Sequence, residues 1–263
     1  MAKRKLSESS TALAALAHLT MGACSRLPIG WAQALGTLLG HLCWLLPTSP
    51  RKVARLNVGW CLPERSPADR RRLVRASLVA TGKNLSEAGA MWRWPAERLA
   101  GLEQEVEGEE LLHRAMAEGR GTVLLVPHLG NWEMLNPFLM ARYPLVALYR
   151  PPRIAQLEQT IRQGREGTGC TMLPATPLGL RRLFKALAAG RLLLILPDQE
   201  PVRSSGVFAP FFGVPALTMT LVRRLLRRFG APALFAYALR TPEGRFSIFF
   251  REAPPGLDDP DPV

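Results

Sequence analysis

Residues 122–133 read "TVLLVPHLGNWE" and join a short apolar run to a histidine, a glycine and a carboxylate. A continuous apolar run of this length is typical of a β-strand that is buried on both faces, as in a parallel sheet. We therefore predict a buried strand over residues 122–127, which delivers His128 to one edge of a sheet.

The segments around this strand alternate between strand and helix patterns. Apolar runs predict buried strands at 145–150 and 191–199, and two strands at 233–239 and 245–250 flank the turn "TPEGR". Amphipathic patterns predict helices at 67–94, 109–119, 154–166, 178–190 and 218–230. Together these elements predict an α/β fold class with a mostly parallel central sheet flanked by helices.

The N-terminal segment, residues 1–50, begins with "MAKRK" and continues with two strongly apolar runs. A membrane-spanning helix needs about 20 apolar residues, and the second run reaches that length only when Pro28, Gln33 and His41 are included. We interpret residues 1–50 as a basic and apolar, helical, membrane-associating segment whose basic residues stay on the cytoplasmic side. Two buried core helices are the alternative.

The stretch after this segment is rich in proline. We interpret residues 47–67 as a connector that leads into a second domain, residues 51–263, which carries the strand and helix alternation.

The overall charge indicates an anionic partner. The chain has 34 Lys and Arg against 21 Asp and Glu, a formal net charge of +13, which suits nucleic acid, an anionic membrane surface or an acidic carrier protein. The apolar N-terminus, and the lack of a recognisable groove-reading or base-stacking motif, argue against nucleic acid. A basic nucleic-acid-binding protein is nevertheless the alternative from another class.

The four cysteines are widely spaced and include no C-x-x-C pair. Their spacing indicates neither a zinc site nor a disulfide framework, so we expect isolated reduced thiols and no metal.

Polar residues follow three of the predicted strands, at the point where each strand ends. His128, Arg150 and Asp198 occupy these positions. Ligands bind at the carboxyl ends of strands in open α/β sheets, so we expect the three residues to share one edge.

The turn after His128 suggests how a catalytic pair could form. Gly130 permits a close backbone approach, Asn131 is a good N-cap for a helix over 132–140, and Glu133 falls in that helix's first turn. A strand-to-helix turn can bring Glu133 back to His128, which makes the imidazole a general base. The helix's first amide groups could then support an oxyanion. A strand-end histidine that is capped locally by a surface glutamate is the alternative.

No serine or cysteine is suitably placed beside His128. We therefore expect direct attack by a substrate hydroxyl rather than a covalent intermediate on the protein.

Four motifs together resemble one known family. "HLGNWE", "YRP" at 149–151, "PDQ" at 197–199 and "FAPFFGVPA" at 208–216 occur in the order and spacing of the lipid A late acyltransferases. These are lauroyl and myristoyl transferases of the lysophospholipid acyltransferase-like superfamily, and the likeness runs from about residue 27 to residue 252.

The resemblance implies that His128 and Glu133 are the catalytic pair and that Arg150 steadies an anionic acceptor. We assign substrate binding to Asn131, Arg150, Asp198, Gln199, Phe211, Phe212 and Gly213. Asp198 would hold Arg150 or a sugar hydroxyl, or alternatively begin its loop as an Asx turn. The phenylalanines would line an acyl-chain groove, or alternatively belong to the core.

The resemblance also implies the reaction and its place in the cell. A fatty acyl group passes from acyl carrier protein or coenzyme A to a hydroxyl of a lipid A precursor. The enzyme sits at the bacterial inner membrane with its active site facing the cytoplasm, and it needs no metal or redox cofactor. Another glycolipid or lysophospholipid, such as a phosphatidylinositol mannoside, is the alternative acceptor.

The basic helix near residues 221–229 carries arginines on one face and apolar residues on another. It suits anionic lipid headgroups or an acidic carrier protein, with an ordinary solvated face as the alternative.

Two features depart from the family pattern. Pro137 is expected to kink or shorten the helix that carries Glu133. The sequence stops at "GLDDPDPV", whereas members usually continue for a few dozen residues, which is consistent with a domain that lacks its C-terminal end or with an incomplete sequence.

Overall fold

The computed structural model describes residues 19–151, 155–167 and 169–259. Part of the predicted membrane-associating segment, residues 1–18, therefore lies outside the described residues. The chain forms two compact units. We call Met91–Gln199 with Met219–Val263 and Met1–Thr20 the sheet unit, and Met21–Ala90 with Glu200–Thr218 the helical unit.

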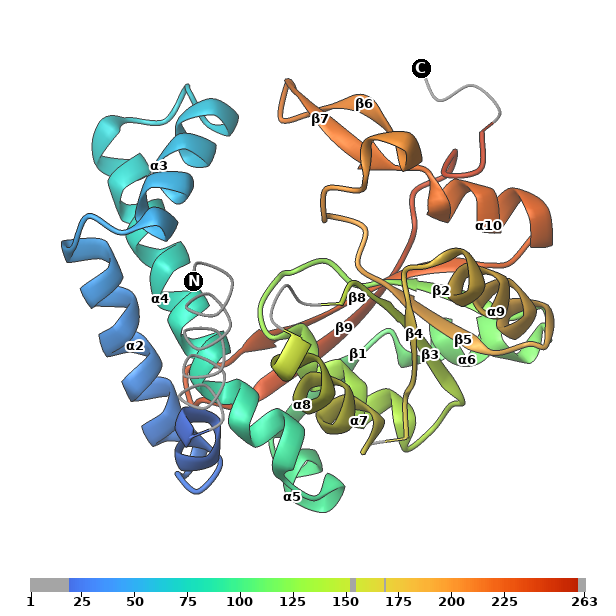
Figure 1. Ribbon diagram of the computed structural model, residues 1–263, viewed down its shortest axis with the longest axis horizontal. Helices are drawn as coiled ribbons and strands as arrows, with labels where there is room; N and C mark the ends of the chain where they lie inside the picture. Colours follow the sequence, from blue (N-terminus) through green and yellow to red (C-terminus); the bar gives the residue numbers. More distant parts are fainter. Residues whose placement is uncertain (1–18, 152–154, 168, 260–263) are drawn as a thin grey trace, which may run out of the picture. The chain divides into compact units, whose positions relative to one another are not determined.

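The sheet unit is built on seven strands in the order β1-β9-β8-β2-β5-β3-β4 (Figure 1). Every neighbouring pair is parallel except β8 with β9, which form an antiparallel pair. The strands are β1 Glu103–Glu107, β2 Thr122–Leu125, β3 Leu145–Tyr149, β4 Thr171–Pro174, β5 Leu192–Ile195, β8 Ala233–Arg240 and β9 Phe246–Glu252. The predicted α/β class with a mostly parallel, helix-flanked sheet is confirmed.

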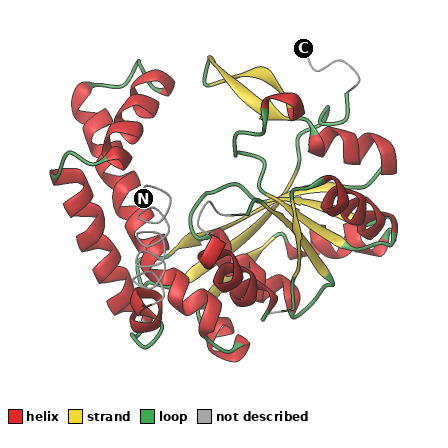
Figure 2. Ribbon diagram, in the orientation of Figure 1, coloured by secondary structure: helices red, strands yellow, loops and turns green. Residues whose placement is uncertain are grey.

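Helices lie on both faces of this sheet (Figure 2). They are α5 Ala96–Ala100, α6 Glu109–Ala117, α7 Leu135–Met140, α8 Ala155–Glu166, α9 Pro177–Ala188 and α10 Leu221–Phe229. Leu183 and Leu187 of α9 and Leu225 of α10 join the strand residues in one buried core cluster. On α7, Phe138 packs against Phe250 of β9. Each residue of β2 and β5 is buried, which explains their uninterrupted apolar sequences.

The basic helix α10 uses its apolar face for the core of the sheet unit. Val222, Leu225 and Leu226 are buried, whereas Arg227 and Arg228 are exposed. The apolar face is therefore covered by protein, and only the cationic face is open to solvent.

The helical unit contains α2 Ile29–Leu45, α3 Ser49–Cys61, most of α4 Pro67–Arg93, and a short hairpin of β6 Gly206–Phe211 and β7 Val214–Met219. The interpretation of residues 47–67 as a connector is wrong, because most of this stretch is α3. Thr48 caps α3 by accepting the backbone N–H of Arg51 at 3.4 Å. Pro50 lies in the first turn, where a missing N–H breaks no helical hydrogen bond.

Helices α2 and α4 touch through their backbones. A Cβ atom added at Gly40 would lie 2.4 Å from Cα of Val79, and one at Gly82 would lie 2.1 Å from the carbonyl oxygen of Gly36. Only glycine permits this approach.

The opposite side of α2 is apolar and exposed. Trp31 is 70% and Leu45 is 63% exposed, and Leu38 is exposed as well. Among the described residues, no helix taken alone has both the length and the apolar character needed to cross a bilayer. Only α2 and α3 taken together reach them, and these two helices meet at a bend of 77°.

Candidate active site

His128 and Asp198 are brought together by the register of β2 and β5. These parallel neighbours pair from Thr122 with Leu192 to Leu125 with Ile195, a constant offset of 70 residues. Each of the two polar residues follows the end of its own strand at the same distance. They therefore face each other at the carboxyl edge of the sheet, as predicted for this edge.

Two hydrogen bonds join this pair. The backbone N–H of His128 donates to Oδ2 of Asp198 at 2.7 Å, and Nδ1 lies 2.9 Å from Oδ1. The side chains are 37% and 35% exposed, so the pair is open to solvent on one side. A carboxylate at Nδ1 favours the tautomer that carries its proton there, which leaves Nε2 as a proton acceptor. The amide nitrogen of Gln199 lies 3.2 Å from Nε2 and can donate to it.

In the structure the partner of His128 is Asp198, whereas the sequence predicted Glu133. Glu133 is 9% exposed and binds Arg165 of α8, with Nη2 to Oε1 at 2.5 Å and Nε to Oε2 at 3.2 Å. The amide of Asn136 donates to the same carboxylate at 3.3 Å. The tight 3₁₀ turn at Trp132–Met134 directs Glu133 to α8, while β5 supplies the carboxylate beside the imidazole. A catalytic role for Glu133 stays a prediction.

Trp132 connects the two carboxylate sites. Its ring packs edge-on against the His128 ring at 5.7 Å between centroids. The guanidinium carbon Cζ of Arg165 lies 4.7 Å from the ring centroid of Trp132 and 5.6 Å from the ring centroid of Trp92. The Arg165 guanidinium and the Glu133 carboxylate thus form a buried ion pair, 15% and 11% exposed, one aromatic ring away from the imidazole.

Sequence reasoning missed both Trp132 and Arg165. Trp132 had a usable signal, because it stands inside the "HLGNWE" motif between two residues that were singled out. Arg165 had none, since it is one of many arginines in the chain.

The turn after His128 is docked on β8. Gly130 has φ +66°, and a Cβ atom there would lie 2.0 Å from the carbonyl oxygen of Ala238. The backbone N–H of Asn131 donates to this same oxygen at 2.9 Å. The predicted close approach at Gly130 is therefore confirmed.

Asn131 fulfils only part of what was expected of it. It occupies the predicted N-cap position, before the 3₁₀ turn Trp132–Met134, but its side chain makes no cap bond there. Its backbone N–H already donates to Ala238, so it cannot support an oxyanion. Its side chain is buried, and substrate binding by it stays a prediction. Pro137 lies in the first turn of α7, which has only six residues, in agreement with the expected short helix.

Arg150 lies at the expected edge. It follows β3, which pairs with β5 in parallel, and it is exposed. Within the described part of the chain no hydrogen bond or ion pair engages its guanidinium. The proposed contact of Asp198 with Arg150 is wrong, because Asp198 holds His128 instead.

Phe211, Phe212 and Gly213 form the end of the β6–β7 hairpin in the helical unit. Phe212 has φ +51° and Gly213 has φ +75°, the backbone of a tight two-residue hairpin turn. Phe211 and Phe212 are 57% and 61% exposed, so the alternative that they belong to the core is wrong. Binding of an acyl chain by these residues stays a prediction.

Comparison with known proteins gives consistent matches. The family model described as bacterial lipid A biosynthesis acyltransferase matches residues 2–260. The chain is 29% identical over 238 residues to the lipid A biosynthesis lauroyltransferase of Escherichia coli K12, covering 89% of this chain and 77% of that protein. It is 28% identical over 214 residues to the palmitoleoyltransferase of the same organism, covering 81% and 69%. A phosphatidylinositol mannoside acyltransferase of Mycolicibacterium smegmatis is 32% identical over 148 residues, covering 54% and 47%.

Proposed function

The chain belongs to the bacterial lipid A biosynthesis acyltransferase family, and we propose that it transfers a fatty acyl group from an acyl thioester to a hydroxyl of a lipid A precursor. Membership makes the protein an acyltransferase. The identities of the acyl donor, the acceptor and the catalytic residues are what we propose. The observation that carries it is the contact between His128 and Asp198 at the carboxyl edge of the sheet.

The proposed reaction uses His128 as the general base. Nε2 takes the proton of the acceptor hydroxyl as its oxygen attacks the thioester carbonyl carbon, and Asp198 stabilises the imidazolium that forms. The tetrahedral intermediate then collapses, the carbon–sulfur bond breaks, and the thiolate recovers the proton from the imidazolium. The products are an ester and a free thiol. Gln199 occupies Nε2 at 3.2 Å, so the acceptor hydroxyl has to displace its amide.

Glu133 has a different part in this scheme. The ion pair with Arg165 holds the guanidinium against Trp132, and Trp132 packs on the imidazole. Glu133 is thus a positioning residue that assists His128 through two intervening side chains.

The remaining features agree with an anionic acceptor and a thioester donor. The planar fork of Arg150 suits a phosphate or carboxylate, and it lies at the same sheet edge as His128. The donor is acyl carrier protein or coenzyme A, and no resident metal or redox cofactor is required, because the attack needs only a proton acceptor. We place the enzyme on the inner membrane, with the site toward the cytoplasm and with residues 1–50 contributing membrane contact.

His128→Ala tests this proposal. We expect loss of acyl transfer from acyl carrier protein or coenzyme A thioesters to a lipid A precursor, with the circular dichroism spectrum unchanged. His113→Ala serves as the matched control, because His113 lies on α6 outside the site and its loss should leave turnover near the wild-type value. Undiminished transfer by the His128 variant refutes the assigned base.

One observation favours a second acceptor class, the phosphatidylinositol mannosides. It is the 32% sequence identity to a phosphatidylinositol mannoside acyltransferase. An assay that offers both acceptors with both donors decides between them. Transfer to the mannoside alone would replace the lipid A precursor in the proposal and leave the catalytic residues as they are.

A further inference from the structure

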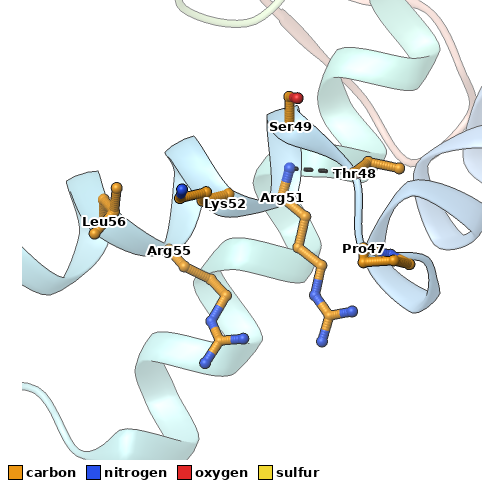
Figure 3. Close-up of a pocket in the computed structure, with 7 residues that line it drawn as sticks. All are labelled: Pro47, Thr48, Ser49, Arg51, Lys52, Arg55 and Leu56. Carbon is orange, nitrogen blue, oxygen red and sulfur yellow. Dashed lines mark hydrogen bonds between the residues drawn. The ribbon is translucent and has the colours of Figure 1, made fainter.

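Two adjoining pockets in the helical unit are lined by basic side chains. The larger, about 610 Å³, is lined by Pro47, Thr48, Arg51, Lys52, Arg55 and Leu56 together with Ser49 (Figure 3). The smaller, about 370 Å³, lies between α3 and α4 and includes Trp44, Arg51, Arg55, Arg70, Arg71 and Val74. Arg51 and Arg55 line both pockets, and Figure 3 shows their guanidinium groups on the same side of α3.

Arg51 is fixed at the junction of these pockets. Its Nη1 donates to the carbonyl oxygens of Leu45 and Leu46 at 3.1 and 3.4 Å, and its Cζ lies 5.9 Å from the Trp44 ring centroid. These contacts hold the side chain in one orientation and leave other N–H donors of the guanidinium for a ligand.

The neighbouring cations lack acidic partners. Within the described residues, no hydrogen bond or ion pair engages the side chains of Lys52, Arg55, Arg70 and Arg71. The two nearest carboxylates along the chain are already paired, Asp69 with Arg72 at 2.8 Å and Glu64 with Arg65 at 3.6 Å. Like charges at close range repel one another. The pockets therefore favour an anionic ligand that relieves this repulsion.

An exposed apolar face of α3 adjoins the pockets at Leu56. Leu56 lines the larger pocket and is 43% exposed. Val53 and Trp60, which are 54% and 60% exposed, continue this apolar face around the helix from Leu56, away from Arg51 and Arg55. Cationic and apolar surfaces side by side on one helix, with an exposed tryptophan, suit the boundary between headgroups and acyl chains.

We propose that the two pockets bind the phosphate of an anionic phospholipid headgroup, with the lipid's acyl chains against Leu56 and the adjoining apolar face of α3. The inference rests on the proposed function only in that the enzyme works on a lipid at a membrane. The site is separate from His128 in the sequence and belongs to the helical unit. An acidic carrier protein would satisfy the arginines, but it gives no reason for an exposed apolar face on the same helix as the basic pockets.

Vesicle binding of the full chain tests this site. Phosphatidylcholine vesicles with and without phosphatidylglycerol are sedimented with wild-type protein, with Arg55→Gln/Arg71→Gln, and with Arg181→Gln/Arg182→Gln. The control pair removes the same charge from exposed positions on α9. We expect the pocket variant to bind phosphatidylglycerol vesicles about tenfold more weakly or worse, because each basic residue at an anionic surface contributes appreciably, and the control to stay close to wild type.

Four results overturn the inference. Wild-type binding by the pocket variant shows that these arginines do not contribute to vesicle binding. An equal loss in both variants shows that only the total charge matters. A loss of affinity for acyl carrier protein without a loss of vesicle binding assigns the arginines to the carrier. Release of the protein from vesicles by millimolar inorganic phosphate identifies a site for free phosphate rather than for lipid.

The outcome is separable from that of the proposed function. With a detergent-dispersed acceptor the pocket variant should keep wild-type turnover, whereas His128→Ala should lose turnover and keep vesicle binding. Arg55→Lys checks the folded state independently, since it keeps the charge and should retain most of the vesicle binding.

Discussion

Both oxygens of the Asp198 carboxylate face His128, one at 2.7 Å from the backbone N–H and the other at 2.9 Å from Nδ1. One contact fixes the backbone of the turn and the other fixes the ring. The carboxylate therefore sets both the place and the tautomer of the imidazole. This double contact exists because β2 and β5 are parallel neighbours in register.

Asp198→Asn should lower kcat about 10²-fold or more. The amide keeps the shape of the side chain but stabilises an imidazolium less well. Its NH₂ group would also face either the backbone N–H or the Nδ1–H of His128, so that two donors would repel each other. Steady-state kinetics with a saturating thioester donor measure the effect. Asp69→Asn in α4 is the control, and wild-type turnover by the Asp198 variant would show that the contact has no part in the reaction.

Glu133→Gln should mainly destabilise the fold. It leaves the Arg165 guanidinium buried without its carboxylate, and breaking a buried ion pair costs about 3–5 kcal/mol. Denaturant unfolding followed by circular dichroism measures the loss. The double variant Glu133→Gln/Arg165→Met should recover part of it, because the unpaired charge is gone.

The same variant separates positioning from direct catalysis. Assayed under conditions where it is folded, Glu133→Gln should lower kcat less than Asp198→Asn does. A loss equal to that of Asp198→Asn would mean that Glu133 acts on the imidazole directly, as the family resemblance implies.

The sequence predicted the sheet edge well and the contacts made there less well. Uninterrupted apolar runs identified β2, β3 and β5, and the residue after each run was correctly placed at one edge. The partner of His128 could not be predicted, because the sequence of one strand does not determine which strands lie next to it in the sheet. Glu133, which is close to His128 in the chain, was therefore preferred to Asp198, which is 70 residues away.

Two other elements were hidden by local composition. The prolines of residues 47–67 suggested a connector, yet Pro50 is compatible with the first turn of α3. The hairpin β6–β7 was not predicted because its large apolar residues are exposed, so no alternation of buried and exposed positions distinguishes it.

Gly40→Val should lower the melting temperature. The new Cβ would lie 2.4 Å from Cα of Val79, so α2 and α4 have to move apart, and overpacking of this kind costs about 1–3 kcal/mol or more. Gly30→Ala on the same helix is the control, since its Cβ would meet nothing within 4 Å. Equal melting temperatures for both variants would show that the helices do not pack closely.

Cys170 should resist alkylation in the folded protein. Burial raises the pKa of its thiol to about 12, and the thiolate is the reactive form. Iodoacetamide labelling followed by peptide mass spectrometry should modify the half-buried Cys43 and Cys61 first. Denatured protein should label at all four cysteines.

The same shift makes stability depend on pH. The thiol of Cys170 ionises in the unfolded chain near its ordinary pKa of about 8.5, whereas in the folded chain it stays protonated until about pH 12. Its contribution to stability is therefore complete below the lower value and decreases as pH rises toward the higher one. Cys170→Ala should remove this part of the pH dependence, and labelling of native Cys170 as fast as Cys43 would contradict its burial.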